Sequence, residues 1–572
     1  MKKSILLFLM ITALLGSFLT GCKPKAEEES ASVDSLVEGS TNQKNPEKLP
    51  EEGSNSETEK PSVNTNDQHQ TTPEDQKDPP SADEPATTPG DDQESPNDPS
   101  SKEETPVINE VSLTNLQTPG ASFPVSAGDT IWFGPMDILT EEFLTFADAS
   151  GNQTKIGKNN VTESDSFSGG YRIYSYKATA AGTVIVNPPQ AYENRFLISK
   201  NQEMTVALYH HHWDQVAGIN LYDGVLEQSR QTINWKGKVS SSSEYHLSHG
   251  ISVKEGDTLT IGPINSAQVV QGYGFDAKGN ATTLINGSNM ANNGSFPQGM
   301  QIYTYTVPAG VYAVQFNVPD AMKNKVMITK NKVFSIAEYQ NTTGVNAATV
   351  GDPLKGSDGL FAGDSINHGL TSRDEEGLAW AGRIARDTGL ISTNVGKSGY
   401  HYAHISSNYG PISDLLEANK KNDFDYVVLQ GGYNDVSKKV KLGKISNSYN
   451  PDTFDTSTFA GGLEYTIYNT IKYHGDTAAI GYIVTFRVPK AGGAEAEYYD
   501  LAKKICEKWG ITFLDLYNNE KLNADLKYDT NEHTNDNLHP DASGYELITP
   551  YVTEYMRTMT PCSQEILEEV LG

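Results

Sequence analysis

Hydrophobic and polar positions follow three different patterns along the chain. Residues 23–106 show no periodic apolar positions, whereas residues 107–342 alternate short runs rich in Val, Ile, Thr, Tyr and Phe with turns of Gly, Asn, Asp and Pro. Such alternation is typical of antiparallel sandwiches. From about residue 356, near-continuous apolar runs are separated by helical periodicity, which indicates buried parallel strands joined by helices. The pattern predicts an all-β region followed by an α/β domain.

The β-rich region contains an internal repeat. The segment VSAGDTIWFGP at 125–135 returns 128 residues later as VKEGDTLTIGP at 253–263, and the turn DASGN at 148–152 returns as DAKGN at 276–280. Each copy has the size of a domain and is longer than a solenoid unit. We therefore expect two tandem sandwiches of the jelly-roll type, over residues 107–216 and 217–342.

The last third of the chain predicts a three-layer, flavodoxin-like α/β domain over residues 356–560. Apolar runs at 360–365, 424–430, 479–485 and 511–515 are the expected strands, and helical patterns cover 459–473 and 497–509. In open sheets of this class the active site lies at the carboxyl edge, where strands end. Polar residues that follow these strands are therefore candidates for a shared site.

The first 22 residues have the pattern of an export signal. A basic start, Met1 to Lys3, precedes an almost wholly apolar run over 5–20, and the run ends in Leu19-Thr20-Gly21-Cys22. This ending resembles the lipobox of bacterial lipoproteins, which implies cleavage before Cys22 and acylation of its sulfur. The alternative is a plain secretory signal with an incidental cysteine. With the lipobox, the expected location is the extracytoplasmic face of the cell membrane, anchored through lipid on Cys22.

Charge is concentrated in the segment that follows the signal. Residues 23–106 hold 22 acidic residues and 7 lysines, with no Phe, Trp or Tyr, in a chain whose formal net charge is −29. A Pro-rich acidic segment of this kind cannot bury enough apolar surface to fold, so we expect a disordered tether. An acidic chain also lacks the excess of Lys and Arg on which nucleic-acid binding depends, and no nucleic-acid partner is expected.

The cysteine count leaves little room for disulfides. The chain has three cysteines, and assignment of Cys22 to lipid leaves Cys506 and Cys562. A single bridge between these two remains open at this stage.

Three residues have the chemistry of a serine nucleophile and its activating partners. Ser365 follows an apolar strand and the small turn residues Gly363 and Asp364, which places a hydroxyl at the carboxyl edge of the sheet. His539 could accept the hydroxyl proton if a carboxylate held its other ring nitrogen, and Asp536 lies three residues earlier. The alternative role for Asp536 is a capping or turn carboxylate. Other candidate bases lack a carboxylate at that spacing; they are His368, His401, His404 and His533.

Four sequence blocks in order resemble the SGNH, or GDSL-type, hydrolase superfamily. They are Gly363-Asp364-Ser365, the glycine block at Gly396, Gly432-x-Asn434-Asp435, and Asp536-x-x-His539; Ile366 replaces the Leu of the family name. The resemblance implies a Ser365–His539–Asp536 triad without a cofactor. It also implies an oxyanion hole made of the backbone N–H groups of Ser365 and Gly396 and the side-chain amide of Asn434. Asp364 and Asp435 are expected to hold turns by backbone hydrogen bonding. Tyr400, Tyr433 and Arg487 could line the substrate site.

Several functions fit these features. The leading hypothesis is a lipid-anchored serine esterase that removes O-acetyl or other short O-acyl groups from a polysaccharide, with an acylated polysaccharide or a small acyl ester as partner. The alternatives are a lipase or lysophospholipase, and a surface glycan-binding protein with a non-essential hydrolase domain. Acyl transfer to another sugar is a further option, because an acyl-enzyme can be resolved by a hydroxyl.

The two sandwiches offer weaker candidates for binding. Exposed aromatic rings could hold glycans, although aromatic residues in small sandwiches usually belong to the core; the candidates are Trp132, Trp213, Tyr273 and Tyr303. In a strand, His210 and His212 would share one face, but no third metal ligand is identifiable, so a surface or turn position is favoured and no metal is expected.

Overall fold

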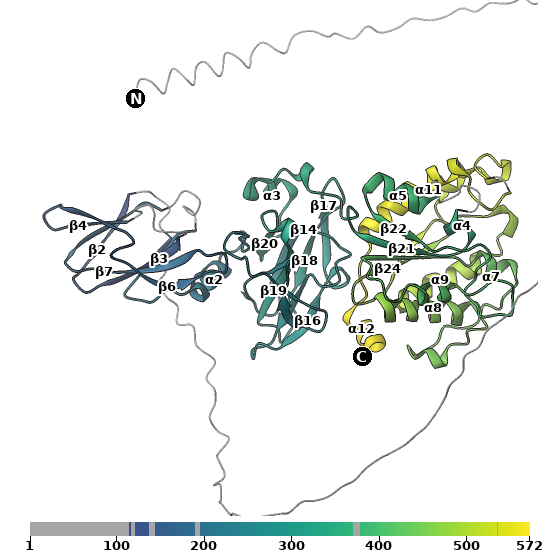
Figure 1. The fold of residues 1–572 in the computed structure, drawn as a ribbon, viewed down its shortest axis with the longest axis horizontal. Coiled ribbons are helices and arrows are strands. Elements are labelled where there is room, and N and C mark those ends of the chain that lie inside the picture. Colours follow the sequence, from purple (N-terminus) through teal and green to yellow (C-terminus); the bar gives the residue numbers. More distant parts are fainter. Residues whose placement is uncertain (1–113, 116–119, 137–143, 189–194, 370–377, 535) are drawn as a thin grey trace, which may run out of the picture. The chain divides into compact units, whose positions relative to one another are not determined.

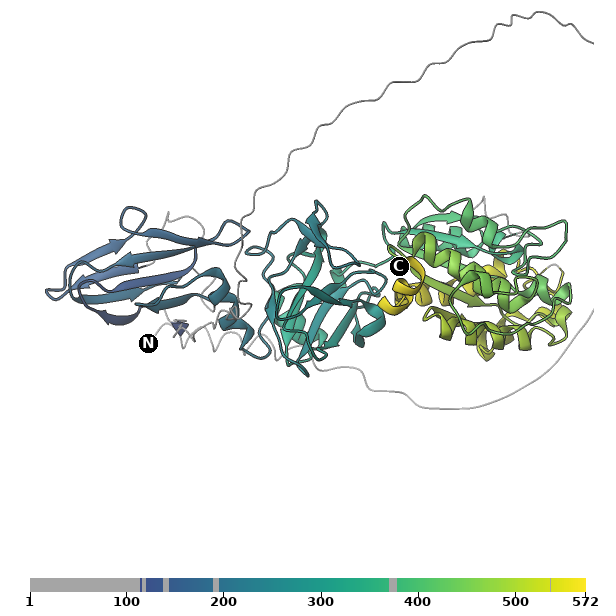
Figure 2. The same cartoon turned by 90° about the horizontal axis from the view of Figure 1, so that it is seen from below.

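The structure is a computed structural model that describes residues 114–115, 120–136, 144–188, 195–369, 378–534 and 536–572. The expected signal at 1–22, the tether at 23–106 and the lipidation of Cys22 lie outside the described residues. The described chain forms two antiparallel β-units and a C-terminal α/β domain (Figures 1 and 2). Among the described helices, none is both long and apolar enough to cross a membrane.

The first β-unit consists of two antiparallel sheets around one core. Their strand orders are β1-β9-β3-β7-β6 and β2-β8-β4-β5. Buried apolar residues from both sheets, such as Ile131 and Val184, belong to a single hydrophobic cluster, because alternate strand positions face inward. The strands are β1 (Thr114–Asn115), β2 (Ala121–Val125), β3 (Thr130–Met136), β4 (Leu144–Asp148), β5 (Gln153–Ile156), β6 (Thr162–Ser166), β7 (Arg172–Lys177), β8 (Gly182–Val186) and β9 (Leu197–Lys200).

The second β-unit has the same plan, preceded by helix α2 (Val206–Asp214) and a two-stranded ribbon of β10 and β11. Its sheets have the orders β17-β18-β14-β20 and β12-β19-β15-β16, with β13 also paired to β19. Helix α3 (Ile336–Thr343) follows it. The strands are β10 (Gln231–Ile233), β11 (Val239–Ser241), β12 (Tyr245–Leu247), β13 (Ile251–Ser252), β14 (Thr258–Ile264), β15 (Gly272–Phe275), β16 (Ala281–Ile285), β17 (Ala291–Ser295), β18 (Gln301–Thr306), β19 (Ala313–Pro319) and β20 (Met327–Lys330).

The two β-units repeat each other in strand order and in side-chain detail. The order β9-β3-β7-β6 corresponds to β20-β14-β18-β17. In the first unit, Asn201 accepts a hydrogen bond from the Thr130 N–H at 2.9 Å and donates to Asp129 at 2.8 Å. Asn331 makes the same pair of bonds in the second unit, to the Thr258 N–H at 2.9 Å and to Asp257 at 3.0 Å. The all-β character expected for this region is confirmed.

The α/β domain is built on a parallel sheet of five strands. Its order is β22-β21-β23-β24-β25, and every residue of the central strands β23 and β24 is buried. Both faces of these strands are covered by helices, which explains their near-continuous apolar sequence. The strands are β21 (Asp358–Ala362), β22 (Ile391–Asn394), β23 (Tyr426–Gln430), β24 (Ala479–Val484) and β25 (Thr512–Asp515).

Helices cover the sheet in two layers, as Figure 1 shows for α5 and α11 on one side and α8 and α9 on the other. The helical periodicity predicted at 459–473 and 497–509 corresponds to α8 and α9. The helices are α4 (Ser365–His368), α5 (Trp380–Thr388), α6 (Ser413–Glu417), α7 (Tyr433–Ser437), α8 (Phe459–His474), α9 (Ala496–Lys508), α10 (Glu520–Leu526), α11 (Ala542–Thr558) and α12 (Gln564–Leu571).

The α/β domain continues past residue 560, where its end was expected. Helix α12 packs against α8 and buries Ile566 and Leu567 in the same hydrophobic cluster as that helix. Cys506 and Cys562 are also buried in this cluster, and both are free thiols, so the structure does not join them by a disulfide.

We predict that Asn331→Ala destabilises the second β-unit by about 1–2 kcal/mol. Asn331 has a φ of 55°, which costs alanine more than asparagine, and the Thr258 N–H loses its acceptor. Faster hydrogen exchange at the Thr258 amide, together with a lower urea midpoint, measures the effect. Asn331→Gly is the matched variant, because it tolerates the backbone angle and isolates the lost hydrogen bonds. An unchanged exchange rate in both variants would contradict this role.

Candidate active site

Ser365 lies in the turn that follows strand β21. Asp364 caps helix α4 by accepting a hydrogen bond from the Ile366 N–H at 2.9 Å. A β-carbon on Gly363 would lie 2.7 Å from both the carbonyl and the side-chain oxygen of Gln430, so glycine is required at this close approach. The turn places the Ser365 hydroxyl at the carboxyl edge of the sheet, where the sequence predicted it.

The buried side chain of Gln430 holds this turn from the neighbouring strand β23. Its Oε1 accepts hydrogen bonds from the backbone N–H groups of Asp364 at 3.3 Å and Asn367 at 3.1 Å. Its Nε2 donates to Thr485 Oγ1 at 3.3 Å. Three adjacent strand ends are therefore fixed relative to the nucleophile candidate. Sequence analysis did not single out Gln430, because an amide at the end of an apolar strand carries no motif.

His539 and Asp536 form a hydrogen-bonded chain with Ser365. His539 Nε2 lies 2.8 Å from Ser365 Oγ, and His539 Nδ1 lies 2.7 Å from Asp536 Oδ2. The other carboxylate oxygen of Asp536 accepts from the backbone N–H groups of His539 at 2.8 Å and Leu538 at 3.1 Å. The structure thus brings together three residues that span 174 positions of sequence.

The carboxylate of Asp536 is held in its ionised form. Burial favours the neutral acid, but the hydrogen bonds from the backbone and ring of His539 outweigh burial and keep the pKa of Asp536 below its ordinary value. An ionised acceptor at Nδ1 orients the ring so that Nε2 faces the serine hydroxyl. The arrangement can therefore transfer the Ser365 proton to His539.

The two other oxyanion-hole candidates lie beside this chain, and both already have protein partners. Asn434, in the first turn of α7, donates an amide hydrogen to the Tyr400 carbonyl at 2.9 Å. The Gly396 N–H donates to Asn394 Oδ1 at 3.0 Å. A β-carbon at Gly396 would lie 2.7 Å from the His368 nitrogen, which explains the glycine. The amide of Asn434 retains a second hydrogen for a ligand, whereas the Gly396 N–H would have to be shared.

The alternative histidines lie next to serines other than Ser365. His401 Nε2 is 2.9 Å from Ser407 Oγ, and His533 Nδ1 is 2.8 Å from Ser543 Oγ. His404 lies 3.2 Å from Ser413 and His368 lies 3.5 Å from Ser398. Of the candidate bases named from the sequence, it is His539 that contacts Ser365.

The residues suggested for the substrate site differ in position. Tyr433 is buried and Tyr400 is half-buried beside Asn434. Arg487 forms an exposed ion pair with Glu520 and lies over the ring of Tyr517, so its position is that of a surface ion pair.

The fold and the hydrogen-bonded chain define a serine hydrolase built on a parallel α/β sheet. The family model described as GDSL-like lipase/acylhydrolase matches residues 361–547. The C-terminal domain of this chain therefore belongs to the GDSL-like lipase/acylhydrolase family and is an SGNH-type esterase domain. The family resemblance drawn from the four sequence blocks is confirmed.

The solved structures that are similar to this chain each cover about a third of it. A Lactobacillus plantarum protein is 19% identical, with a TM-score of 0.30, over 35% of this chain and 95% of its own. A lipase/acylhydrolase from Enterococcus faecalis is 18% identical, with a TM-score of 0.24, over 36% and 98%. A catalytic mutant of an acetylxylan esterase from Geobacillus stearothermophilus is 16% identical, with a TM-score of 0.26, over 35% and 94%. No curated protein matches the chain.

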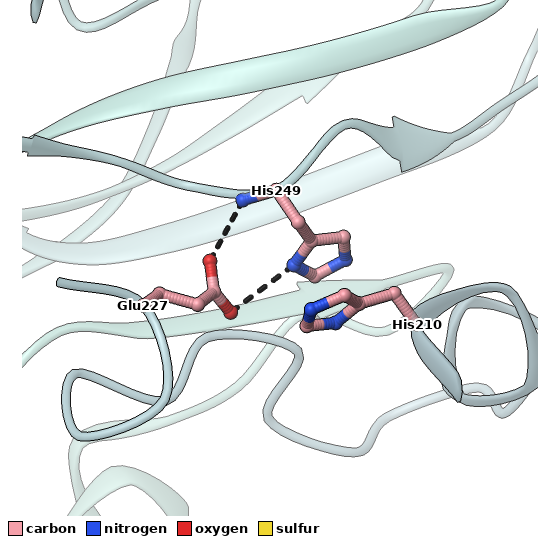
Figure 3. A group of neighbouring side chains, drawn as sticks. All are labelled: His210, Glu227 and His249. Carbon is pink, nitrogen blue, oxygen red and sulfur yellow. Dashed lines mark hydrogen bonds and ion pairs between the residues drawn. The ribbon is translucent and has the colours of Figure 1, made fainter. Parts of the chain in front are cut away.

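A second cluster of titratable residues lies away from Ser365, at helix α2. His210, Glu227 and His249 offer ligand atoms within 4.8 Å of one another, and Figure 3 shows the two rings face to face. The expectation of a surface or turn position for His210 is wrong, because 206–214 is helical and His210 is buried. Its neighbours come from distant positions that no local spacing reveals.

The geometry of this cluster is that of a charged imidazole clamped by carboxylates. His249 Nδ1 lies 3.1 Å from Glu227 and Nε2 lies 3.0 Å from Asp214. Burial alone would lower the pKa of His249, but the two carboxylates raise it to about 10. Burial and the nearby charge of His249 lower the pKa of His210 to about 3. The rings stack at 3.9 Å and 14°, and parallel rings do not direct their in-plane lone pairs at one ion.

The aromatic candidates for glycan binding in the β-units are mostly core residues. Trp213, Tyr273 and Tyr303 are each at most 5% exposed. Trp132 is half-buried and packs against the cluster that contains Trp213. These rings therefore do not form an exposed platform.

We predict that Asp364→Asn reduces the pH dependence of stability. Burial raises the pKa of Asp364 to about 6, against about 3.9 in an unfolded chain. The folded state retains a proton in that window that the unfolded state releases. The free energy of unfolding therefore falls by about 2–3 kcal/mol as pH rises through the window.

Asparagine keeps the helix cap without the ionisable group. Urea titrations at about pH 4 and pH 8, bracketing the window, measure the difference. The exposed-site variant Asp452→Asn is the control and should follow the parent. A parent-like pH dependence in Asp364→Asn would refute the assignment.

Proposed function

We propose that this chain is an extracytoplasmic, lipid-anchored serine esterase that removes O-acetyl or other short O-acyl groups from a polysaccharide. The single observation that carries the proposal is the hydrogen-bonded chain from Asp536 through His539 to Ser365, with distances of 2.7 and 2.8 Å. Ser365 is the nucleophile, His539 is the general base and Asp536 is the orienting carboxylate. The anchor on Cys22 follows from the lipobox-like sequence.

In this mechanism, His539 takes the Ser365 proton as Oγ attacks the ester carbonyl. The imidazolium then donates the proton to the sugar oxygen as its bond to the acyl carbon breaks, and the acyl-enzyme is hydrolysed by the equivalent sequence with water. The negative oxygen of each tetrahedral intermediate is assigned to the Ser365 N–H, the Asn434 amide and the Gly396 N–H. The last donor must exchange or share its bond to Asn394.

Support for a polysaccharide is indirect. Two β-units precede the esterase domain, and polar side chains surround the serine turn, including Asn434, Ser398 and Lys397. The jelly-roll class of the β-units is part of the proposal, and the two antiparallel sheets of each unit support it. A short acyl group with a polar alcohol suits such surroundings better than a long hydrocarbon chain.

The other candidate functions differ in what they require. A lipase or lysophospholipase needs an apolar path for a long acyl chain, and the anchor would bring it near lipid. A surface glycan-binding protein with a non-essential hydrolase domain would not need the Ser365–His539 contact at all. Acyl transfer uses the same acyl-enzyme with a sugar hydroxyl in place of water.

We predict that Asn434→Ala lowers kcat roughly 100- to 1000-fold, because one preorganised donor to the tetrahedral oxygen is lost. Initial rates on p-nitrophenyl acetate measure the loss. Ser365→Ala is the reference for complete loss of triad chemistry, and circular dichroism checks that both variants are folded. Parent-like turnover by Asn434→Ala would remove the amide from the mechanism, and parent-like turnover by Ser365→Ala would refute the esterase proposal.

We predict that kcat/KM is highest for acetyl esters and declines with acyl length. The physical reason is that each added methylene, worth about 0.8 kcal/mol when buried, gains nothing unless a dry apolar pocket receives it. Rates on p-nitrophenyl esters from acetate to palmitate make the comparison. A steady rise toward long chains would favour the lipase alternative.

A further inference from the structure

A run of lysines without carboxylate partners in the described residues begins directly after the helix that carries Asn434. The segment from Lys438 to Lys444 contains four lysines, Lys438, Lys439, Lys441 and Lys444, and no acidic residue occurs between Asp435 and Asp452. We call this segment the basic strap. Lys439, Lys441 and Lys444 are exposed. No ion pair within the described part of the chain engages any of the four.

The basic strap lies at the same edge of the sheet as Ser365. Strand β23 ends at Gln430, whose side chain holds the serine turn, and α7 follows directly with Asn434 in its first turn. Lys438 is the C-cap of α7, about 6 Å along the helix axis from Asn434. The Lys441 carbonyl then accepts from the first residue of α8, Phe459. The strap therefore runs from the oxyanion candidate across the start of α8.

A further lysine, Lys397, and two aromatic rings extend this surface near the serine turn. The backbone N–H of Lys397 donates to the Gly363 carbonyl at 3.0 Å, two positions before Ser365. Its ammonium lies 5.6 Å from the ring centre of Tyr400. The Lys438 ammonium lies 5.3 Å from the ring centre of Tyr409, which is 50% exposed. The exposed ring of Tyr409 next to an ammonium group presents a flat apolar face and a positive charge to a ligand.

The exposed lysines beside the serine turn have a distinct chemical preference. An ammonium group that has no carboxylate partner within the protein is available to an anion supplied by a ligand. Several such groups within one short segment fit a polymer with repeated negative charges, and a sugar ring can stack on the exposed face of Tyr409. A neutral glycan would leave the strap unused.

We propose that the basic strap and Lys397 select an O-acylated polysaccharide whose repeating units carry carboxylate or phosphate groups. This inference rests on the esterase function proposed for Ser365 and names the substrate class of that site. The anionic groups of the polymer lie along the lysines while the acyl ester enters beside Asn434. Carboxylate and phosphate share the charge that the strap recognises, and the experiment separates them.

The test compares the full chain with a strap variant, Lys439→Gln/Lys441→Gln/Lys444→Gln. The matched control, Lys355→Gln/Lys421→Gln/Lys504→Gln, removes the same charge from exposed lysines in segments that lead into the amino ends of β21, β23 and β25. The polymer substrates are O-acetylated polygalacturonate, an O-acetylated ribitol phosphate polymer and neutral O-acetylated glucomannan. p-Nitrophenyl acetate reports on the triad separately.

We expect the parent to hydrolyse at least one acidic polymer with a higher kcat/KM than the neutral polymer. The strap variant should lose roughly tenfold in kcat/KM on that polymer, mainly through KM. The control variant should remain within about twofold of the parent. Raising NaCl from about 0.05 M to 0.5 M should remove the preference, because exposed charges are screened. Comparison of the two acidic polymers identifies carboxylate or phosphate.

Two results would overturn the proposal: equal rates of the parent on acidic and neutral polymers, or unchanged rates of the strap variant on both acidic polymers. Failure of the esterase function is distinguishable, because it is a parent that does not cleave p-nitrophenyl acetate in a Ser365-dependent way. In that case, affinity electrophoresis of Ser365→Ala still tests whether the strap binds anionic polymers. The gels contain unacylated polygalacturonate, ribitol phosphate polymer or dextran. Retardation by an acidic polymer that is lost on adding the three strap substitutions supports it, and equal mobility in all three gels refutes it.

Discussion

The position of Ser365 depends on a buried amide in the middle of the sheet. Gln430 is fully buried, and its side chain accepts from two backbone N–H groups of the serine turn while donating to Thr485 on the next loop. A buried amide satisfied in this way is rigid, because any displacement leaves polar groups unpaired in a medium where that costs about 1–3 kcal/mol each. The position of Ser365 is therefore fixed by the centre of the fold. His539, which lies just before the first residue of α11, contacts the Ser365 hydroxyl.

A second set of hydrogen bonds fixes the loop that Asn434 contacts. Both oxygens of the buried Asp435 carboxylate accept from backbone N–H groups, those of Tyr402 and Ala403, each at 3.0 Å. Asn434 reaches the neighbouring carbonyl of Tyr400, so adjacent residues of α7 are joined to one loop. Burial raises the pKa of Asp435 to about 6, which means that the ionised form is kept at a cost. Protonation of Asp435 would weaken one of its two carboxylate oxygens as an acceptor, and these oxygens hold the loop that Asn434 contacts.

Sequence alone could find those parts of the site whose partners are close in sequence or follow a period. Asp536 and His539 are three positions apart, and the uninterrupted apolar runs of β23 and β24 predicted strands buried on both faces. Parts that depend on long-range packing could not be found. Gln430 has no local signature, and His210 gains Glu227 and His249 through contacts between distant segments. The run of three histidines was interpreted as a surface or turn segment, whereas the Thr205 cap and the buried residues Tyr209 and Trp213 belong to a helix.

The net charge of the whole chain is negative, whereas the charge of the strap beside the site is positive. Which of the two acts on a bound polymer depends on how far each charge lies from it. The formal net charge is −29, yet at physiological ionic strength exposed charges act over a Debye length of about 8 Å. The lysines of the strap form no ion pair within the described residues, and the flanking acid Asp435 is buried and bonded to backbone. Elsewhere an acidic surface repels a polyanion. Repulsion over most of the protein and attraction along one segment together orient an anionic chain more sharply than attraction alone, because the competing modes of approach are disfavoured.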